Sequence, residues 1–428
     1  MSNADLFGTS PDARPSTQSP EQEDRRRSRA WRAAPASGSR EEPAAAAATP
    51  LLTRGRQAFD LLLERYRRWR DETVASPRFQ AWAARAWLTR GIARRDADRL
   101  FDLTAGFVYA QILEAVVALG VLEALREGPM DAGALAPRIG LVPERAEILL
   151  QGAAALGLTQ RLRDGRHRLG RLGAAALGAP GVLPMIRHHK HFYADLADPV
   201  ALLRGPGETA LATFWPYVRG EHAVSDADAQ VYSELMAASQ SMVAQDTLDA
   251  VSLRGRRRLL DVGGGAGAFA EAAARRWPEL EVRVLDLPAV AEAATARFEA
   301  AGLGMRAQAV GGDFLSAPLP KGADAVSLIR VLYDHTDETV AALLRRVFQA
   351  LPPGGLLILS EPMAGGARPC KAGDGYFALY TLAMTTGQAR SADRHRALLE
   401  AAGFMVDRPR RPARPFVTST LTARKPST

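Results

Sequence analysis

One short segment constrains the fold of this chain more than any other. The apolar run Leu259-Leu260 leads through Asp261-Val262 into the turn Gly263-Gly264-Gly265-Ala266-Gly267, and residues 269–276 then have helical spacing. Glycines allow a tight turn and a close approach of the backbone to a ligand. Amides that open the following helix can bind a carboxylate or a phosphate. We therefore predict a strand, a ligand-binding turn and a helix, an arrangement that dinucleotide-binding proteins share.

The residues around this segment have the pattern of a parallel sheet. From about residue 246 onward, short apolar runs alternate with helix-like segments. We expect strands at residues 258–262, 281–285, 323–329 and 355–360. Such alternation is typical of a parallel sheet that helices cover on both faces. The prediction is an α/β fold with a Rossmann-like domain over residues 236–428.

Two further acids follow the glycine-rich turn along the chain. Asp286 ends the second strand, where its carboxylate can accept hydrogen bonds from ribose hydroxyls. Asp313 precedes Phe314, and a carboxylate beside an aromatic ring suits the amino group and ring face of an adenine. Each aspartate alone is more often a helix cap or a loop residue. Together with the glycine-rich turn, their order along the chain favours a nucleotide-like cofactor.

The first 95 residues have a different composition. Residues 1–50 are rich in Ala, Pro, Ser and Arg, and we expect them to be a disordered extension. Residues 51–95 carry apolar side chains at spacings of three and four positions. This spacing predicts basic amphipathic helices, with a break near Pro77 because proline cannot continue a helix.

Residues 96–235 predict a small helical domain. We expect a helix over residues 100–125, a short helix from Asp131, a helix over residues 144–156 and a hairpin within residues 158–169. Helices followed by a hairpin indicate a winged helix, which in other proteins binds DNA. The helix over 144–156 contains a single arginine and is too apolar for a recognition helix. A dimer interface explains its leucines and alanines better, so we predict a homodimer and no nucleic-acid partner.

The formal net charge of +8 is concentrated in one segment. Residues 54–100 contain twelve arginines against six aspartates and glutamates, a local charge of +6. The segment also carries Trp69, Trp82 and Trp87. Basic and tryptophan-bearing helices favour an anionic membrane surface, so residues 54–95 are a candidate for peripheral membrane contact. A solvated arginine-rich helix face is the alternative.

Composition also bears on compartment and metal binding. Cys370 is the single cysteine, which excludes an internal disulfide and favours the cytoplasm. No run of about 18 uninterrupted apolar residues is present, so we expect no membrane span. Residues 187–191 contain three histidines but no acid or thiol at ligand spacing. We interpret them as a helix face or the rim of a substrate pocket, and we expect no metal.

The motifs of the second half resemble those of the two-domain O-methyltransferases, a family that includes plant caffeate-type and acetylserotonin-type enzymes. The resemblance is carried by Asp261 to Gly267, Asp286-Leu287-Pro288 and Gly312-Asp313-Phe314. It implies a winged-helix dimerisation domain over residues 96–235, followed by a domain that binds S-adenosyl-L-methionine (SAM). The cofactor-binding residues that it implies are Asp261, Gly263, Gly265, Asp286, Leu287, Asp313, Phe314 and Arg330.

Other segments resemble the carotenoid hydroxyl O-methyltransferases of purple photosynthetic bacteria. They are residues 75–80, 100–103, 105–109, 192–196 and 214–218. The resemblance implies methylation of a tertiary hydroxyl on an acyclic carotenoid. C-methylation of a chlorin pigment and O-methylation of a small aromatic or polyketide are the alternatives. The residues that we expect at the acceptor pocket are Met236, His188 and Phe192.

The sequence departs from the family where the catalytic residues are expected. Family members have His-Asp-Trp after the fourth strand, with the His as general base, and here the matching residues are Tyr333-Asp334-His335. One orienting glutamate matches Glu361, but Ala389 replaces the second. An alcohol must lose its proton when it is methylated, so a base is still needed. His335 is our first candidate, with Tyr333 as a hydrogen-bonding partner of the acceptor and Glu361 as the orienting residue. Packing roles are the alternative for all three.

Overall fold

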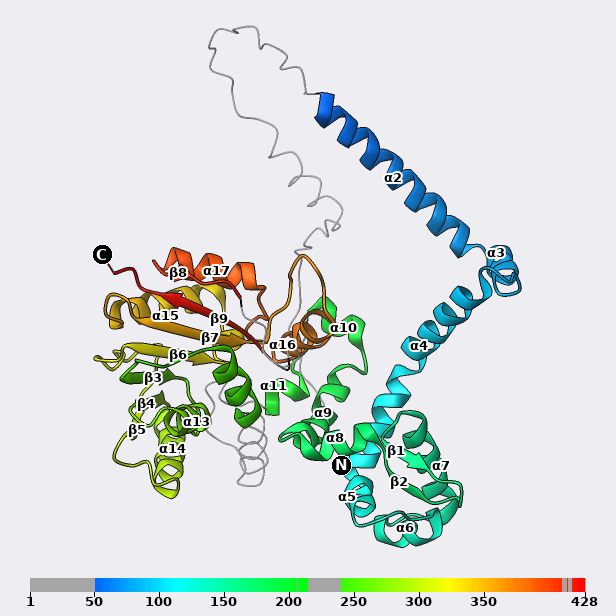
Figure 1. The fold of residues 1–428 in the computed structure, drawn as a ribbon, viewed down its shortest axis with the longest axis horizontal. Coiled ribbons are helices and arrows are strands. Elements are labelled where there is room, and N and C mark those ends of the chain that lie inside the picture. The colour runs from blue at the N-terminus through cyan, green and yellow to red at the C-terminus, as the bar shows by residue number, and fades with distance from the viewer. Residues whose placement is uncertain (1–50, 206, 215–239, 410–413, 415–417, 428) are drawn as a thin grey trace, which may run out of the picture. The chain divides into compact units, whose positions relative to one another are not determined.

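The computed structural model describes residues 51–205, 207–214, 240–409, 414 and 418–427. The chain divides into two compact units, Met1–Arg99 and Leu100–Thr428 (Figure 1). Three of our predictions lie outside the described residues. They are the disorder of residues 1–50, the domain boundary between residues 235 and 236, and the place of Met236 in the acceptor pocket.

The described part of the first unit is helical. Helix α2 (Leu51–Ala75) and helix α3 (Pro77–Ala83) are separated at Ser76, which confirms the predicted break near Pro77. Pro77 lies in the first turn of α3. A proline is tolerated there because the backbone N–H groups of the first turn have no acceptor within the helix. The indole rings of this unit face solvent: Trp69, Trp82 and Trp87 are 61%, 57% and 77% exposed.

Helix α4 (Arg90–Ala118) is long and apolar enough, by length and composition, to cross a membrane. Our criterion of uninterrupted apolar residues missed it because Asp102 and Glu114 interrupt the run. Only 11% of its apolar window is buried. Phe101, Leu103 and Phe107 are each more than 60% exposed. Among the described residues, the helix thus presents an exposed apolar surface.

The winged helix follows in the predicted order. We expected one helix over residues 100–125, but Gly120 has a φ of 69° and separates α4 from α5. The side chain of Asp131 caps α6 by accepting a hydrogen bond from the amide of Ala134, 2.8 Å away. Strands β1 and β2 pair antiparallel, which confirms the hairpin. The elements are α5 (Val121–Arg126), α6 (Ala132–Ile139), α7 (Pro143–Ala155), β1 (Thr159–Arg161) and β2 (His167–Leu169).

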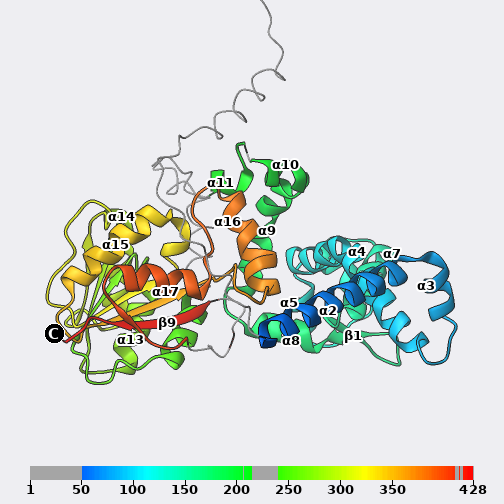
Figure 2. The same cartoon turned by 90° about the horizontal axis from the view of Figure 1, so that it is seen from above.

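Helices connect the winged helix to the sheet domain. Helix α9 packs beside α16, although the two are far apart in the sequence (Figures 1 and 2). A further helix covers residues 240–250. The connecting elements are α8 (Arg171–Gly178), α9 (Val182–Asp195), α10 (Pro199–Arg204) and α11 (Ala210–Phe214), and later in the chain a π-helical segment η3 (Lys371–Phe377) and α16 (Ala378–Ala383).

The C-terminal domain has a seven-stranded sheet of order β5-β4-β3-β6-β7-β9-β8. The four strands that we predicted are present, and β9 is antiparallel to β7. The strands are β3 (Arg258–Val262), β4 (Glu281–Asp286), β5 (Ala307–Gly311), β6 (Ala325–Ile329), β7 (Leu356–Glu361), β8 (Met405–Val406) and β9 (Ser419–Arg424). The helices between them are α13 (Ala268–Arg276), α14 (Pro288–Ala300), α15 (Asp337–Ala350) and α17 (Ala392–Ala401).

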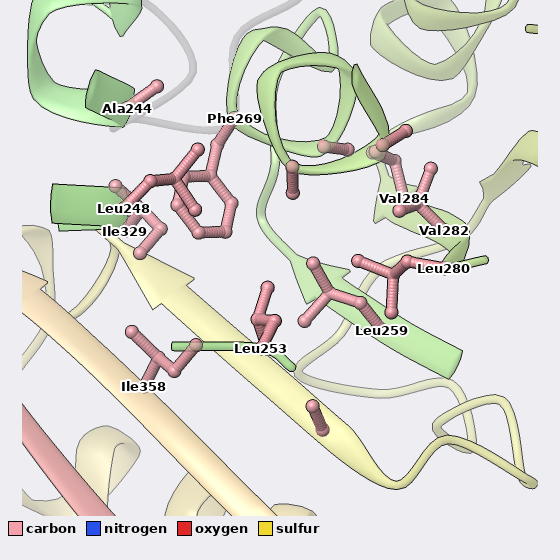
Figure 3. Close-up of a cluster of buried hydrophobic side chains, with 14 of the residues drawn as sticks. Ala244, Leu248, Leu253, Leu259, Phe269, Leu280, Val282, Val284, Ile329 and Ile358 are labelled. Carbon is pink, nitrogen blue, oxygen red and sulfur yellow. The ribbon is translucent and has the colours of Figure 1, made fainter. Parts of the chain in front are cut away.

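Each face of this sheet packs on its own hydrophobic core. Successive strand residues point to opposite faces, so Leu259 joins one core and Leu260 the other. Phe269 of α13 packs with Leu259 on the first face (Figure 3). Residues of α15 and α17 cover the second face. Burying a leucine side chain stabilises the fold by roughly 1.5–3 kcal/mol, so these cores hold the strand ends in register.

The strand order reverses between β3 and β6, because the chain adds β4 and β5 on one side of β3 and then β6 and β7 on the other. At such a reversal the loops that leave two neighbouring strands diverge and open a crevice at their carboxyl ends. The glycine-rich turn leaves β3 there, and residues 330–335 leave β6 there. We call residues 330–335 the 330–335 loop. It contains the short helix η2 (Leu332–Asp334).

Candidate active site

Asp261 is fully buried at the carboxyl end of β3. Its Oδ1 accepts a hydrogen bond from the hydroxyl of Ser327 on β6, 2.6 Å away. Its Oδ2 is buried and has no hydrogen-bond partner among the described residues. Burial raises the pKa of the Asp261 carboxyl to about 7. A buried acceptor atom without a donor is rare, so this oxygen is suited to a donor from a ligand.

The glycine-rich turn approaches its neighbours too closely for side chains. A Cβ on Gly264 would lie 2.5 Å from Asp261 Oδ2, and one on Gly263 would lie 2.8 Å from a methyl group of Val331. Gly263 and Gly265 also have φ angles of 66° and 58°, a region that glycine enters without strain. The turn therefore needs these glycines for packing as well as for an open approach to its amides.

Asp286 links the end of β4 to the same turn. Its Oδ2 accepts a hydrogen bond from the amide of Gly265 at 2.8 Å, and its Oδ1 accepts one from the amide of Leu287 at 2.8 Å. Burial raises the pKa of Asp286, and the two amide donors oppose that shift. Leu287 is exposed and begins the segment that leads into α14. The structure thus brings Asp261, Gly265 and Asp286 together at one edge of the sheet.

Asp313 and Phe314 follow β5 at the same edge. The Oδ1 of Asp313 accepts from the amide of Leu315 and its Oδ2 from the hydroxyl of Ser316, both at 2.8 Å. These bonds fix the turn and orient the carboxylate. The ring of Phe314 lies beside Gly263, since an atom of the ring would be 3.4 Å from a Cβ built there. Phe314 therefore borders the glycine-rich turn.

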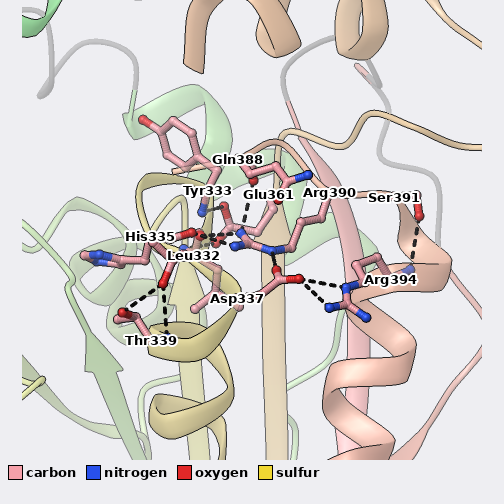
Figure 4. Close-up of polar contacts among 11 residues, drawn as sticks. Leu332, Tyr333, His335, Asp337, Thr339, Glu361, Gln388, Arg390, Ser391 and Arg394 are labelled. Carbon is pink, nitrogen blue, oxygen red and sulfur yellow. Dashed lines mark hydrogen bonds and ion pairs between the residues drawn. The ribbon is translucent and has the colours of Figure 1, made fainter. Parts of the chain in front are cut away.

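The 330–335 loop carries the predicted catalytic residues but points them in different directions (Figure 4). Arg330 has a φ of 58°, an uncommon conformation for a residue with a Cβ. Tyr333 is buried in an apolar cluster with Phe192 and Tyr380. His335 instead meets the ring of Phe314 edge to face, with centroids 5.7 Å apart. Our first choice of base is therefore placed beside a predicted adenine-binding residue, away from the Tyr333 cluster.

The pKa values of the loop residues are shifted in different directions. Burial is the main cause that lowers the pKa of His335, and the positive charge of Arg390 lowers it a little further. Burial raises the pKa of the Tyr333 hydroxyl above its ordinary value. Burial also raises the pKa of Asp334 to about 8, with the charge of Glu361 adding to the shift. The Oδ1 of Asp334 is buried without a hydrogen-bond partner in the described part of the chain.

Glu361 contacts the loop through its backbone. We expected this carboxylate to orient the side chain of His335 or Tyr333. Its Oε1 instead accepts from the amides of Val331 and Leu332, at 2.9 and 2.8 Å, and its Oε2 accepts from the amide of Tyr333 at 3.4 Å. Burial raises the pKa of Glu361 to about 7, against the three amide donors. Glu361 thus orients Tyr333 by fixing its backbone.

An apolar and aromatic cluster lies on the other side of Tyr333. Nε2 of His188 is 2.8 Å from the hydroxyl of Tyr380, so the two form a buried hydrogen bond. Phe192 packs edge to face on Tyr380 with centroids 5.4 Å apart. Burial lowers the pKa of His188 to about 3, so its imidazole is neutral. Phe192 and Tyr333 belong to one buried cluster, which we call the acceptor cluster, and His188 adjoins it through Tyr380. The members of the acceptor cluster are Phe192, Leu202, Leu211, Tyr333, Tyr380, Ala383 and Met384.

The three histidines of residues 187–191 lie beside this cluster. His189 lies 2.8 Å from the hydroxyl of Tyr376 through its Nε2, and His188 pairs with Tyr380. Among the residues that the structure describes, no group of three or more His, Cys, Asp or Glu side chains could hold a metal ion. The imidazoles of His188 and His189 thus have tyrosine hydroxyls as partners.

Comparison with known proteins gives the family. An O-methyltransferase domain model matches residues 193–405, and an O-methyltransferase dimerisation domain model matches residues 101–177. The chain belongs to the O-methyltransferase family. This methyltransferase is SAM-dependent, as we predicted from the glycine-rich turn and the acids that follow.

Two relatives cover most of the chain. A demethylspheroidene O-methyltransferase from Cereibacter sphaeroides is 51% identical over 355 residues, which are 83% of this chain and 94% of the relative. One from Rhodobacter capsulatus is 47% identical over 79% of this chain and 84% of the relative. The solved structure of human N-acetylserotonin methyltransferase in complex with SAM matches with a TM-score of 0.66 and 26% identity, over 77% of this chain and 98% of that one.

The geometry at the sheet edge fits SAM. The unpartnered Oδ2 of Asp261 is suited to a donor such as an ammonium group, and it lies against the glycine-rich turn, where a Cβ on Gly264 would be 2.5 Å away. Sequence reasoning missed Ser327, Asp334, Tyr380 and Arg390. Ser327 was detectable as a polar residue inside an apolar strand, where a buried hydroxyl needs a partner. Asp334, Tyr380 and Arg390 could not be detected in this way, because their contacts join segments that are far apart in the sequence.

Proposed function

We propose that this methyltransferase transfers the methyl group of SAM to the tertiary hydroxyl of an acyclic carotenoid, of the demethylspheroidene or hydroxyneurosporene type, in carotenoid biosynthesis. The observation that carries the proposal is the 51% and 47% identity to two demethylspheroidene O-methyltransferases over about four fifths of the chain. The acceptor cluster agrees with an apolar acceptor, because its members are aliphatic and aromatic apart from two tyrosine hydroxyls.

For the cofactor residues we propose the roles that we expected from the sequence. Asp261 and the turn at Gly263 and Gly265 bind the amino acid end of SAM, Asp286 with Leu287 binds its ribose, and the adenine lies by Asp313 and Phe314. Arg330, which we also expected at the cofactor, follows the neighbouring strand β6, and its Nη2 lies 3.4 Å from the hydroxyl of Tyr333. When bound, SAM supplies an electrophilic methyl group on a positively charged sulfur. The protein must then orient the acceptor oxygen and remove its proton.

The placement of the loop residues changes our assignment of the acceptor side. Tyr333 belongs to the acceptor cluster, so its hydroxyl is the group that binds the acceptor oxygen. His335 belongs to the cofactor side, because its imidazole contacts Phe314. The acceptor oxygen gains the methyl group and loses its proton to a base on the Tyr333 side. Asp334 is the carboxyl group next to Tyr333, and in its ionised form, which its pKa of about 8 makes the main form only at alkaline pH, its unpartnered Oδ1 can accept that proton.

The test is incubation of the purified full-length protein with SAM labelled at the methyl group and demethylspheroidene dispersed in detergent. We expect a labelled methoxy carotenoid, identified by mass spectrometry. A chlorin precursor and 3-hydroxy-5-methyl-1-naphthoate are the comparison acceptors, and the latter is the acceptor in the name of a Streptomyces sahachiroi relative that is 35% identical over 61% of this chain. Labelling of either one without the carotenoid would overturn the proposal.

We also propose that residues 54–95 contact the surface of the inner photosynthetic membrane, where a long carotenoid dissolves, while the enzyme is otherwise cytoplasmic. The exposed indoles of Trp69, Trp82 and Trp87 lie among the twelve arginines of residues 54–100, which is a suitable surface for anionic lipid headgroups. The triple change of these tryptophans to Ser should weaken binding to vesicles that contain phosphatidylglycerol. Met305→Ser, at a residue 99% exposed in the other unit, is the matched control. Equal binding by both variants would refute the contact.

A homodimer is the assembly that the dimerisation domain supports, and we propose that α4 supplies part of its interface. The family model for that domain begins at residue 101, within α4. Phe101, Leu103 and Phe107 are exposed in the single chain. A second copy that covers them would remove the exposed apolar surface from water, which favours association.

A further inference from the structure

Arg390 is an arginine whose side chain is completely buried next to the 330–335 loop. Its Nη1 donates to the carbonyl oxygen of Leu332 at 2.8 Å, and its Nη2 donates to the carbonyl oxygen of His335 at 2.6 Å. Its Nε donates to Oδ1 of Asp337 at 2.5 Å, at the start of α15 (Figure 4). One guanidinium group thus bonds to the loop twice and to the helix that follows.

Glu361 bonds to the same loop with the opposite charge. Its carboxylate accepts from the amides of Val331, Leu332 and Tyr333. Leu332 makes hydrogen bonds to both groups: its amide donates to Glu361, and its carbonyl oxygen accepts from Arg390. Hydrogen bonds to charged groups are roughly twice as strong as those between neutral groups. The two side chains therefore satisfy the backbone of a tight turn that has few partners of its own.

The segment that carries Arg390 also packs its backbone against the loop. The amide of Gln388 donates to the carbonyl oxygen of Tyr333 at 2.8 Å. Gly387 has a φ of 76°, and a Cβ there would lie 2.1 Å from the same oxygen and 2.6 Å from Cα of Asp334. No side chain fits between the two segments, so a shift of residues 387–390 would be transmitted to Tyr333 and Asp334.

We propose that Arg390 is a positioning residue that, with Glu361 and the backbone of Gly387 and Gln388, fixes the 330–335 loop so that Tyr333 points into the acceptor cluster and His335 toward Phe314. The loop begins at Arg330 in a left-handed conformation that is unfavourable for a non-glycine residue, so its conformation depends on such external bonds. Arg390 acts through the backbone and need not touch either substrate. The part of the proposal that concerns turnover rests on the proposed function.

The experiment compares Arg390→Lys with Arg394→Met in the full-length protein. Lysine keeps the charge of Arg390, but its single nitrogen cannot reach Leu332, His335 and Asp337 together. Arg394 is a matched control because it bonds to the other oxygen of Asp337, Oδ2, and is 53% exposed. We expect Arg390→Lys to lower kcat for the carotenoid at least tenfold, with the Kd for SAM within about threefold of the wild-type value. We expect Arg394→Met to retain wild-type kcat.

Hydrogen exchange separates positioning from general destabilisation and needs no acceptor. In Arg390→Lys, the amides of Val331, Leu332 and Tyr333 should exchange at least tenfold faster, while those of β6 and β7 stay as protected as in the wild type. Unchanged exchange in the loop, or an equal loss of protection across the whole sheet, would overturn the proposal. If the wild-type enzyme fails to methylate the carotenoid, the proposed function fails, and the exchange measurement still decides the role of Arg390.

Discussion

The imidazole of His335 and the ring of Phe314 meet edge to face, with an interplanar angle of 80° and centroids 5.7 Å apart. Because Phe314 also lies beside Gly263, His335 lies on the side of the site where we propose that the cofactor binds. Tyr333, two residues earlier, is buried with Phe192 and Tyr380. The two residues that we considered together as catalytic thus serve different parts of the site.

The first prediction separates these two residues. His335→Ala should raise the Kd for SAM about three- to tenfold, since an edge-to-face aromatic pair contributes about 0.5–1.5 kcal/mol beyond its buried area. Its kcat at saturating SAM should stay near the wild-type value. Tyr333→Phe should leave the Kd for SAM unchanged and lower kcat at least tenfold. Calorimetric titration and initial rates measure these quantities, and a collapse of kcat in His335→Ala would restore the histidine as the base.

The second prediction concerns Asp286. Asp286→Ala removes both oxygens that accept from Gly265 and Leu287 and that we assign to the ribose, so the Kd for SAM should rise by about tenfold or more. Glu281→Ala is the matched control, because Glu281 is an acid at the other end of the same strand, where it pairs with Arg258. Calorimetric titration should show wild-type affinity for this control. Equal affinities of the two variants would remove Asp286 from the cofactor site.

The third prediction concerns pH and the stability of the cofactor-free protein. Burial raises the pKa values of Asp261 and Glu361 to about 7 and of Asp334 to about 8. Between pH 6.5 and 8 the folded state therefore binds more protons at these carboxyls than the unfolded state does, so the free energy of unfolding should fall as pH rises. Below pH 6.5 the buried imidazoles of His188 and His395, with pKa values lowered to about 3, act in the opposite direction. The carboxyls and the imidazoles oppose each other below pH 6.5, so the prediction is a fall in stability between pH 6.5 and pH 8.

Asp334→Asn tests this pH dependence, since it removes one of the three raised carboxyls without changing its shape. Urea unfolding at pH 6.5 and at pH 8 should show a smaller loss of stability in the variant than in the wild type. Asp313→Asn is the control, because that carboxylate lies at the surface and accepts from Leu315 and Ser316 within its own turn. An identical loss in wild type and Asp334→Asn would mean that Asp334 is not protonated in the folded protein.

The fourth prediction concerns α4. Phe107→Asp places a charge at a position that is 73% exposed in the single chain, so the stability of an isolated chain should change little. If α4 lies in the dimer interface, the buried charge will favour monomers, and the mass measured by light scattering after size-exclusion chromatography will halve. Met405→Asp, at another exposed apolar residue, should leave the mass unchanged. A Phe107→Asp protein that keeps the dimer mass would place the interface elsewhere.

The parts of the fold that the sequence alone determined are those that depend on neighbours along the chain. The strand at 258–262, the glycine-rich turn and the caps at Asp131 and Pro77 follow from side-chain spacing and from backbone sterics, which act over a few residues. The strand end that carries Asp286 could be placed for the same reason, whereas strand β5, which precedes Asp313, was not predicted. The break between two helices at Gly120 was not predicted, because the apolar pattern continues through this residue.

The partners of the catalytic residues were decided only by the tertiary structure. Glu361 lies 28 residues after Tyr333 and Arg390 lies 55 residues after His335, and the crossover connections of the sheet bring all four to one edge. The acceptor cluster likewise joins Phe192 to Tyr380 across most of the domain. Hydrophobic spacing specifies which face of an element is buried, but not which side chain it meets there. That choice depends on how separate elements pack, so Tyr333 and His335 could be identified from the sequence as candidates while their directions could not.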